Sequence, residues 1–156
     1  MTSMRHTVSF ISLPVADVAR SCRFYESMGL EASARSRPEA VFFQMNGLVL
    51  AVADRTAMSN GLGVSMGGSR SSRDNTTRAA SVVLSHNVRR EEEVDELLAR
   101  AKAAGGRIEK RAGPAPWGGR TGCFVDPDGH LWEVVFNDGM PMDAMGNVFL
   151  EPPGVW

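Results

Sequence analysis

The sequence is short of the residues that mark several classes of protein. Its 156 residues include only two cysteines, Cys22 and Cys123, which lie far apart and form no metal or redox motif. Two isolated cysteines are typical of reduced thiols in a cytoplasmic protein. No apolar run is long enough to span a bilayer, and the first ten residues lack the apolar stretch of a signal peptide. We therefore expect a cytoplasmic protein with no membrane partner.

An excess of charge of either sign is also lacking. Seventeen basic and eighteen acidic residues leave a net charge of −1, and no long basic or acidic tract occurs. This balance argues against nucleic acid as a partner. The hydrophobic share of 43% is ordinary for a globular protein, and the length suits one compact domain with a core of normal size.

Apolar periodicity predicts two helices. The first covers Val18–Met28, with Asp17 as N-cap and Gly29 as the C-terminal stop. The second covers Arg90–Ala104, where acidic residues at the start and basic residues at the end suit the helix dipole. The buried stripes are predicted to be Val18, Cys22, Tyr25 and Met28, with Phe24 on the margin, and then Val94, Leu97, Leu98 and Ala101.

Short alternating or apolar runs predict eight strands. Pro14 is expected to end the first, and Asn46-Gly47 is a strong hairpin signal. The strands are predicted at Thr7–Leu13, Glu31–Arg35, Ala40–Met45, Leu48–Ala53, Ala79–Ser85, Arg107–Lys110, Gly122–Val125 and Leu131–Phe136.

The two halves of the chain have the same element order: a strand, a helix that ends in glycine, then three strands. An internal duplication explains this order, with Phe10–Leu13 superposed on Ser81–Leu84 and Ala51 matching Glu133. We expect an α+β fold of two tandem βαβββ modules that form a curved mixed sheet around a cleft, with helices on the outer face.

The expected organisation is a single domain. Module 1 covers about residues 5–54, a loop about 55–78, module 2 about 79–137, and a C-terminal tail 138–156. The loop is rich in Gly, Ser, Asn and Arg, and Thr56–Asn60 suits one helical turn. We favour partial disorder there, and a lid over a ligand is the alternative.

The most informative stretch is residues 121–137, a hairpin in which the turn Asp126–Gly129 joins two apolar runs. Its second run contains one acid, Glu133. Burying a carboxylate in an apolar strand is costly unless it has a partner or faces a cleft. Glu133 is therefore a candidate functional residue, and a satisfied structural glutamate is the alternative.

The chain resembles the vicinal oxygen chelate superfamily, which includes glyoxalases, bleomycin-resistance proteins and extradiol dioxygenases. The residues that carry the resemblance are Leu13–Leu30, Phe42–Val52, Ser81–Val88 and Trp117–Asn137. The helix ending FYESMGL and the hairpin DPDGHLWEV are fairly specific in combination. The resemblance implies the two-module fold, a ligand cleft and a homodimer.

In enzymatic members of that superfamily, His and Glu side chains hold a divalent metal in the cleft. The matching positions here are Phe10, Ala51, Ser81 and Glu133, of which only Glu133 is of ligand type. The resemblance therefore brings the fold without the metal site, and we expect no metal and no other cofactor.

Without a metal, strand alternation predicts a mostly apolar cleft wall that includes Phe10, Ser12, Ala51, Ser81, Leu131 and Glu133. Trp117 and Arg120 enter the hairpin from a glycine-rich loop and are candidates to stack on and clamp a planar or anionic ligand. The alternatives are that Trp117 plugs the end of the sheet and that Arg120 is solvated or paired to an acid.

Three functions follow from these residues. The first is a metal-independent protein that binds a small hydrophobic or aromatic compound. The second is a glyoxalase-like lyase or isomerase, or a dioxygenase-type enzyme, with Glu133 as general acid and base or as the sole protein metal ligand; an apolar setting would favour the protonated acid. The third is an interaction module whose cleft is filled by its own side chains.

Overall fold

A computed structural model describes residues 4–66 and 82–151. The chain divides between residues 69 and 70 into two compact units. Each unit has its own mixed sheet, one of three strands and one of four, and the described residues contain three helices. The α+β class expected from the sequence is confirmed. None of the helices in these residues has the length and apolar character needed to cross a bilayer.

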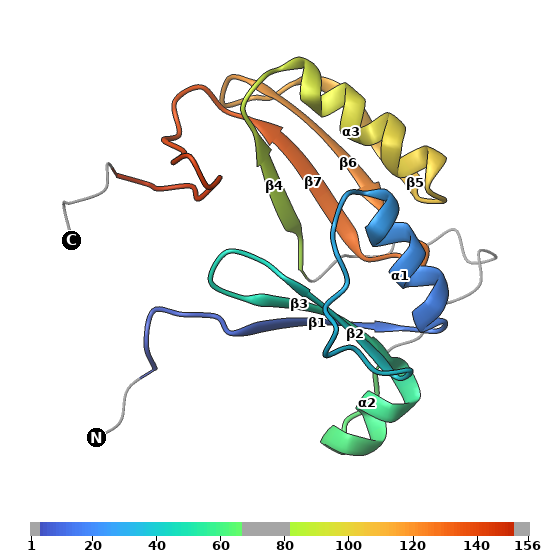
Figure 1. Cartoon of the computed structure of the whole chain (residues 1–156). Coiled ribbons are helices and arrows are strands. Elements are labelled where there is room, and N and C mark those ends of the chain that lie inside the picture. The colour runs from blue at the N-terminus through green and yellow to red at the C-terminus, as the bar shows by residue number, and fades with distance from the viewer. Residues whose placement is uncertain (1–3, 67–81, 152–156) are drawn as a thin grey trace. The chain divides into compact units, whose positions relative to one another are not determined.

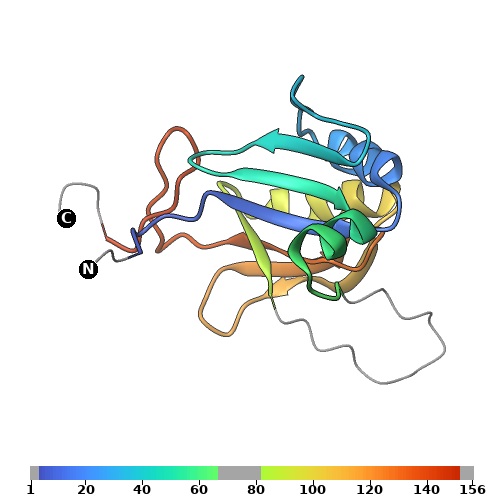
Figure 2. The same ribbon diagram turned by 90° about the horizontal axis from the view of Figure 1, so that it is seen from below.

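Unit 1 contains a mixed three-stranded sheet with the order β1-β3-β2, in which β1 runs parallel to β3 and β2 antiparallel to it (Figure 2). Its elements are β1 (Phe10–Val15), α1 (Val18–Ser27), β2 (Ala40–Gln44), β3 (Val49–Asp54) and α2 (Arg55–Leu62). The hairpin at Asn46-Gly47 is present, with Gly47 at φ 73°. The strand predicted at Glu31–Arg35 is reduced to a single bridge between Ala32 and Phe43.

Pro14 does not end the first strand, as the sequence had suggested, but lies inside β1, opposite Ala53. The reason is that β1 is an edge strand of this sheet, where a residue without an N–H can face away from the neighbouring strand. The strand therefore begins at Phe10 and continues to Val15, two residues beyond the predicted end.

Helix α1 has the predicted bounds within one residue, and the Asp17 carboxylate accepts a hydrogen bond from the Arg20 N–H at 2.9 Å. Its predicted buried stripe is confirmed only in part: Tyr25 and the marginal Phe24 are buried, but the third buried residue is Ser21, and Val18, Cys22 and Met28 are only half-buried. The large rings decide the rotation of the helix: Tyr25 packs edge-on against Phe24 and lies 5.8 Å from the ring of Phe43.

Helix α2 occupies the first part of the segment in which the sequence predicted one helical turn. The Asp54 carboxylate caps it by accepting a hydrogen bond from the Ala57 N–H at 2.8 Å, and Gly63 ends it at φ 66°. Residues 67–78, for which disorder and a lid were the alternatives, lie outside the described residues.

Unit 2 has the complete βαβββ order, with a sheet arranged β4-β7-β6-β5. Its elements are β4 (Leu84–Val88), α3 (Glu92–Ala103), β5 (Arg107–Pro114), β6 (Arg120–Val125) and β7 (Leu131–Phe136). Strand β4 is parallel to β7, and the other neighbours are antiparallel. The first strand again lies later in the sequence than the predicted range, Ala79–Ser85. Helix α3 runs along one face of this sheet (Figure 1).

The face beneath α3 is the core of unit 2. Val94, Leu98 and Ala101 of the helix are buried, as the periodicity predicted, and pack over β5, β6 and β7. The helix approaches β6 so closely that a Cβ atom at Gly122 would lie 2.5 Å from Leu98 Cδ1. A Cβ atom there would also lie 3.1 Å from the backbone of Ala112 and of Lys110, so glycine suits this position on the even-numbered, helix-facing side of β6.

The turn between β6 and β7 is held by Asp126, which is buried. Its Oδ1 accepts hydrogen bonds from the backbone N–H groups of Asp128 at 3.0 Å and His130 at 2.9 Å. Its own N–H donates to the carbonyl of His130, and Gly129 has the positive φ of 88° that the turn needs. The hairpin predicted here is confirmed, and Val125 pairs with Leu131.

Candidate functional site

Glu133 lies at the centre of the candidate site, on the face of the unit 2 sheet opposite α3. Thr121 Oγ1 donates to Glu133 Oε1 at 2.9 Å, and Ser85 Oγ donates to Glu133 Oε2 at 3.0 Å. Thr121 is buried, whereas Ser85 is exposed. Each carboxylate oxygen is thus held by one hydroxyl from a neighbouring strand, and the orientation of Glu133 is fixed from both sides.

Cys123 pairs directly with Glu133 across β6 and β7, so the thiol shares the face of the carboxylate. Burial raises the pKa of Cys123, and the negative charge of Glu133 adds to the effect, while Lys110 opposes it. The thiol is therefore in its neutral form at neutral pH and is a poor nucleophile. Leu131 and Val135, two residues to either side of Glu133 on β7, complete an apolar border.

Three predicted site residues lie together in unit 1. Ser12 and Ala51 are direct partners in the parallel pair of β1 and β3, and Phe10 is two residues before Ser12 on the same face. Phe10 is 57% exposed, and its ring meets that of Phe42 edge-on at 6.4 Å. This face offers aromatic surface and one hydroxyl, with no charged group among these four residues.

Trp117 lies in the turn between β5 and β6 and is half exposed. This turn brings Gly119 against the end of β7, since a Cβ atom at Gly119 would lie 2.2 Å from the Phe136 carbonyl oxygen and 3.2 Å from the Trp117 ring. The indole therefore sits where β7 finishes, three residues beyond Glu133 along the strand.

Arg120 does not lie on the face of Glu133, which corrects the expectation that it clamps a ligand there. It precedes Thr121 on β6, and alternation turns it to the helix side of the sheet. Its Nε and Nη2 both lie 2.9 Å from Asp95 Oδ2 of α3. The alternative in which Arg120 is paired to an acid is the one observed.

Ser81 lies outside the described residues, and the repeat aligns differently at this point from the sequence prediction. Ser12 pairs with Ala51, and Ser85 pairs with Glu133, so the first strands correspond through Ser12 and Ser85. The residue equivalent to Phe10 is accordingly Val83 and not Ser81. The two-residue error arose because Leu13 was matched with Leu84, whereas the strand pairs make Leu13 equivalent to His86.

Sequence reasoning missed the two hydroxyl donors as partners of Glu133. The signal for Thr121 was available in the hairpin: once Val125 closes the turn with Leu131, Cys123 faces Glu133 and Thr121 falls two residues further along the same face. Ser85 required the pairing of β4 with β7, which is set by contacts between distant parts of the chain.

The side chains around Glu133 do not fit the divalent metal that the resemblance associates with enzymatic relatives. Its carboxylate oxygens accept from two hydroxyls, and neutral hydroxyls are weak ligands for Zn²⁺, Ni²⁺ or Fe²⁺. His86 pairs with Val134 and so faces the other side of the sheet. Across residues 4–66 and 82–151, no three His, Cys, Asp or Glu side chains gather as metal ligands do.

A protein-family model described as the Glyoxalase/Bleomycin resistance protein/Dioxygenase superfamily matches residues 4–134. The chain belongs to this superfamily. A search of curated proteins finds no match. Membership confirms the resemblance inferred from the sequence, and it covers both units.

Solved structures of the superfamily have the same fold. A glyoxalase-related enzyme from Fulvimarina pelagi is 40% identical, with a TM-score of 0.81, covering 93% of this chain and 98% of that one. A glyoxalase/bleomycin resistance protein/dioxygenase from Nocardioides is 25% identical, with a TM-score of 0.66 and coverage of 86% and 85%. Lactoylglutathione lyase from Agrobacterium tumefaciens, 20% identical with a TM-score of 0.60 and coverage of 86% and 96%, shares the fold.

Proposed function

We propose that this superfamily member binds a small hydrophobic or aromatic molecule, without a metal ion, at the sheet face that carries Glu133. The observation that supports this most is the setting of the carboxylate. Glu133 is held by Thr121 and Ser85 on a face that α3 does not cover, and its strand neighbours there are apolar. An apolar surface with a few fixed polar groups is the usual chemistry of small-molecule sites.

The hydrogen bonding of Glu133 restricts the ligand further. A carboxylate has about four acceptor positions. Thr121 and Ser85 use two of them, so each oxygen keeps one position for a ligand donor. The ligand is therefore an apolar molecule that carries an N–H or O–H group, and an anion would be repelled.

A second function is favoured by the same carboxylate, namely a lyase or isomerase in which Glu133 moves a proton. A carboxylate held in one orientation, with free acceptor positions, is suited to general acid–base work. Two similar structures are described as a glyoxalase-related enzyme and a lactoylglutathione lyase. In this alternative Thr121 and Ser85 still act only as hydrogen-bond donors that orient Glu133.

One substitution separates the two functions. Glu133→Gln keeps the shape of the side chain and one acceptor oxygen, so a binding protein should lose only about tenfold in affinity for a donor-bearing aromatic such as indole or catechol. An enzyme should lose turnover of lactoylglutathione, or of another substrate found for it, almost completely. Glu96→Gln on the exposed side of α3 is the matched control, since it makes the same change away from the site.

Thermal-shift and calorimetric titrations measure the affinity, and metal analysis of protein purified without chelator measures any bound ion. A tight stoichiometric divalent metal would overturn the metal-independent proposal. Equal affinity of wild type and Glu133→Gln for every donor-bearing aromatic would show that the ligand site lies elsewhere. A complete lack of shift would favour the third reading, an interaction module with a self-filled cleft.

We also propose that the protein is a homodimer. The tail after β7 supports this, because the side chains of Met145, Val148 and Leu150 are exposed there. Isolated apolar side chains are common on surfaces, but a group of them on one segment suits a partner. Sedimentation velocity of the wild type and of Leu150→Ser tests it, and a monomeric wild type at micromolar concentration would refute it.

A further inference from the structure

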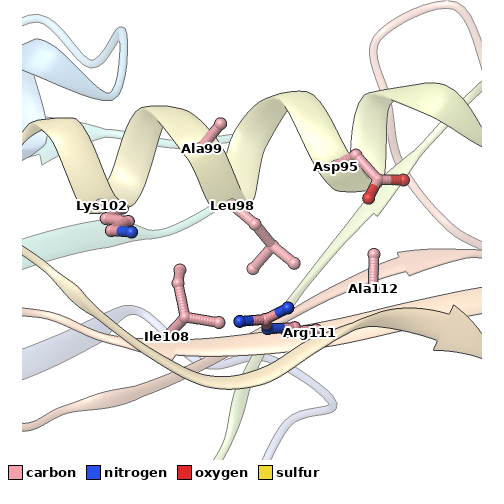
Figure 3. Close-up of a pocket in the computed structure, with 7 residues that line it drawn as sticks. All are labelled: Asp95, Leu98, Ala99, Lys102, Ile108, Arg111 and Ala112. Carbon is pink, nitrogen blue, oxygen red and sulfur yellow. The ribbon is translucent and has the colours of Figure 1, made fainter.

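Helix α3 and the edge strand β5 enclose a groove on the side of the unit 2 sheet away from Glu133 (Figure 3). Its floor is apolar and is formed by Leu98 and Ala99 of the helix and by Ile108 and Ala112 of the strand. Leu98 is only 5% exposed and points from the helix toward the strand. The groove belongs wholly to unit 2 and is separate from the candidate site described above.

Two cations stand at the border of this apolar floor. Lys102 comes from α3 and Arg111 from β5, and the Arg111 guanidinium lies beside Ile108 and below Leu98 in the view of Figure 3. Neither side chain makes an ion pair with any residue in the described ranges 4–66 and 82–151. Both positive charges are therefore available to a bound group.

The acid in the groove does not cancel these charges. Asp95 lies at one end, and its Oδ2 already accepts from both Nε and Nη2 of Arg120 at 2.9 Å. That pair is neutral as a unit, which leaves Lys102 and Arg111 as an uncompensated charge of two. The groove is complementary to an anion with an apolar body.

The irregular pairing of β5 explains why a charged side chain enters this groove. The register of β5 against β6 shifts between Ile108 and Lys110 and again between Lys110 and Gly113. A β-bulge adds a residue to one strand and re-aims the side chains that follow it. Ile108 and Arg111, three residues apart, therefore both line the groove, which regular alternation would not allow.

Gly122 of β6 leaves the space that Leu98 and the backbone of Ala112 occupy at the floor of the groove. A Cβ atom there would lie 2.5 Å from Leu98 Cδ1 and 3.1 Å from the Ala112 nitrogen. The absent side chain lets Leu98 and the bulged strand meet over β6, so that the floor is continuous. The groove measures about 250 Å³, below the range of about 300–1,000 Å³ typical of drug-sized ligands.

We propose that the groove between α3 and β5 is a second binding site, for a small organic anion with an apolar body such as an aryl carboxylate. The ring lies on Leu98 and Ile108, and the carboxylate meets the Arg111 guanidinium, which can bind two oxygens at once, with Lys102 as a second positive charge.

Benzoate is the probe, with benzamide as its uncharged analogue and benzylamine as the cation. In ¹H–¹⁵N spectra of the full chain, benzoate should give saturable shifts at the amides of Leu98, Ile108 and Ala112 at millimolar concentration. Benzamide should bind about tenfold more weakly and benzylamine not at all, because the charge supplies most of the affinity at such a site. Added salt should weaken benzoate binding.

Variants test the two cations separately. Arg111→Gln should lower benzoate affinity about tenfold and Lys102→Gln about threefold. Arg23→Gln, an exposed position on α1 of unit 1, removes the same charge elsewhere and should leave affinity unchanged. Thermal unfolding of each variant shows that it is folded before the titration is interpreted.

Several outcomes would overturn the proposal. These are the absence of saturable shifts at the three amides, equal binding of benzoate and benzamide, or wild-type affinity in Arg111→Gln. Binding of an acidic peptide at these amides without binding of benzoate would assign the groove to a protein partner and would equally refute a small-molecule site. None of these results depends on Glu133, so the proposed function stands or falls separately.

Discussion

The two units pair their strands in the same way, but the side chains at equivalent paired positions differ. In unit 1 the row runs Ser12, Ala51, Phe42, and in unit 2 the corresponding row runs Ser85, Glu133, Cys123. The diagonal position next to the row also differs: Ala40 in unit 1 corresponds to Thr121 in unit 2, because they pair with Ala53 and Val135 respectively. Unit 2 thus has both the acid and its buried hydroxyl donor, and unit 1 has alanine at both positions. The serine, Ser12 or Ser85, is common to the two units.

The largest effect is expected from placing the acid in the unit that lacks it. Ala51 is only 3% exposed, and Ser12 would be the single hydroxyl beside a new carboxylate. Ala51→Glu should lower the free energy of unfolding by about 3–5 kcal/mol relative to Ala51→Gln, since an uncompensated charge would be buried. Urea unfolding of both variants measures the difference, and Gln serves as the control for size.

Adding Ala40→Thr to Ala51→Glu should recover about 1 kcal/mol, because it supplies a donor at the position that Thr121 occupies in unit 2. If Ala51→Glu proved as stable as Ala51→Gln, the two rows would not differ in their tolerance of charge and the comparison would lose its physical basis.

A smaller effect is expected from removing the donors in unit 2. Thr121→Val leaves Glu133 Oε1 without its buried partner and should cost about 1–2 kcal/mol of unfolding free energy. Ser85→Ala should cost less, about 0.5 kcal/mol, because Ser85 is exposed and water replaces its hydroxyl. Thr56→Val on the exposed side of α2 is the control for loss of a hydroxyl alone.

A double-mutant cycle of Thr121→Val with Glu133→Gln should give a coupling energy of about 1 kcal/mol, as expected for side chains in direct contact. Additive free energies in that cycle would mean that the hydrogen bond contributes nothing to stability.

Each unit contains one cysteine whose pKa is affected by a nearby carboxylate. Burial raises the pKa of both, and an acid adds to each: Glu26 for Cys22 and Glu133 for Cys123. Glu133→Gln should lower the pKa of Cys123 and raise its thiolate fraction, so that iodoacetamide reacts about threefold faster at neutral pH. Peptide mass spectrometry should find the labelling rate of Cys22 unchanged in that variant. Glu26→Gln should instead speed the labelling of Cys22 and leave that of Cys123 unchanged. Faster labelling of both thiols by Glu133→Gln would indicate loosening of the fold instead.

The smallest effect on stability is expected from the acidic residues that accept backbone hydrogen bonds at the first turns of α1 and α3. Asp17 caps α1 from before the helix, whereas Glu93 lies inside α3 and reaches back to the N–H groups of Arg90 and Arg89. Those hydrogen bonds, that of Arg90 first, hold the pKa of Glu93 below its usual range. Ionised Glu93 therefore stabilises the folded state above the ordinary glutamate pKa, and this contribution is lost as the pH falls through the lowered value.

Glu93→Gln should consequently cost less than about 1 kcal/mol at pH 7, and the cost should shrink as the pH falls through the lowered pKa of Glu93 and the wild-type side chain also becomes neutral. Melting temperatures of the two proteins from pH 3 to 7 measure this, and a difference that persists unchanged into acid would contradict the assignment.

The element order and most strand positions were predictable because they depend on local signals. Asp17, the Asn46-Gly47 turn and the DPDG turn each act within a few residues, and all three were read correctly. The errors arise where distant contacts decide. Pro14 fits inside β1 only because that strand is at an edge, and the rotation of α1 depends on the contact of Tyr25 with Phe43, eighteen positions further along the chain.

The candidate site was predictable in its main residue and not in its surroundings. Glu133 stood out as an acid in an apolar strand, and alternation placed it away from the helix correctly. Arg120 was assigned to the wrong face because its partner, Asp95, is on a helix 25 residues earlier. Arg111 could not have been placed, since a bulge breaks the alternation on which such reasoning depends.

The buried Asp126 gives the hairpin turn one acceptor for two backbone donors, and so fixes how many residues the turn contains. Side chains on a strand alternate, so inserting or deleting a single residue there would turn the whole of β7 over. Glu133 would then be driven beneath the helix and Val134 brought out in its place. The face of the sheet on which Glu133 lies is thus determined by the carboxylate of Asp126, seven residues upstream.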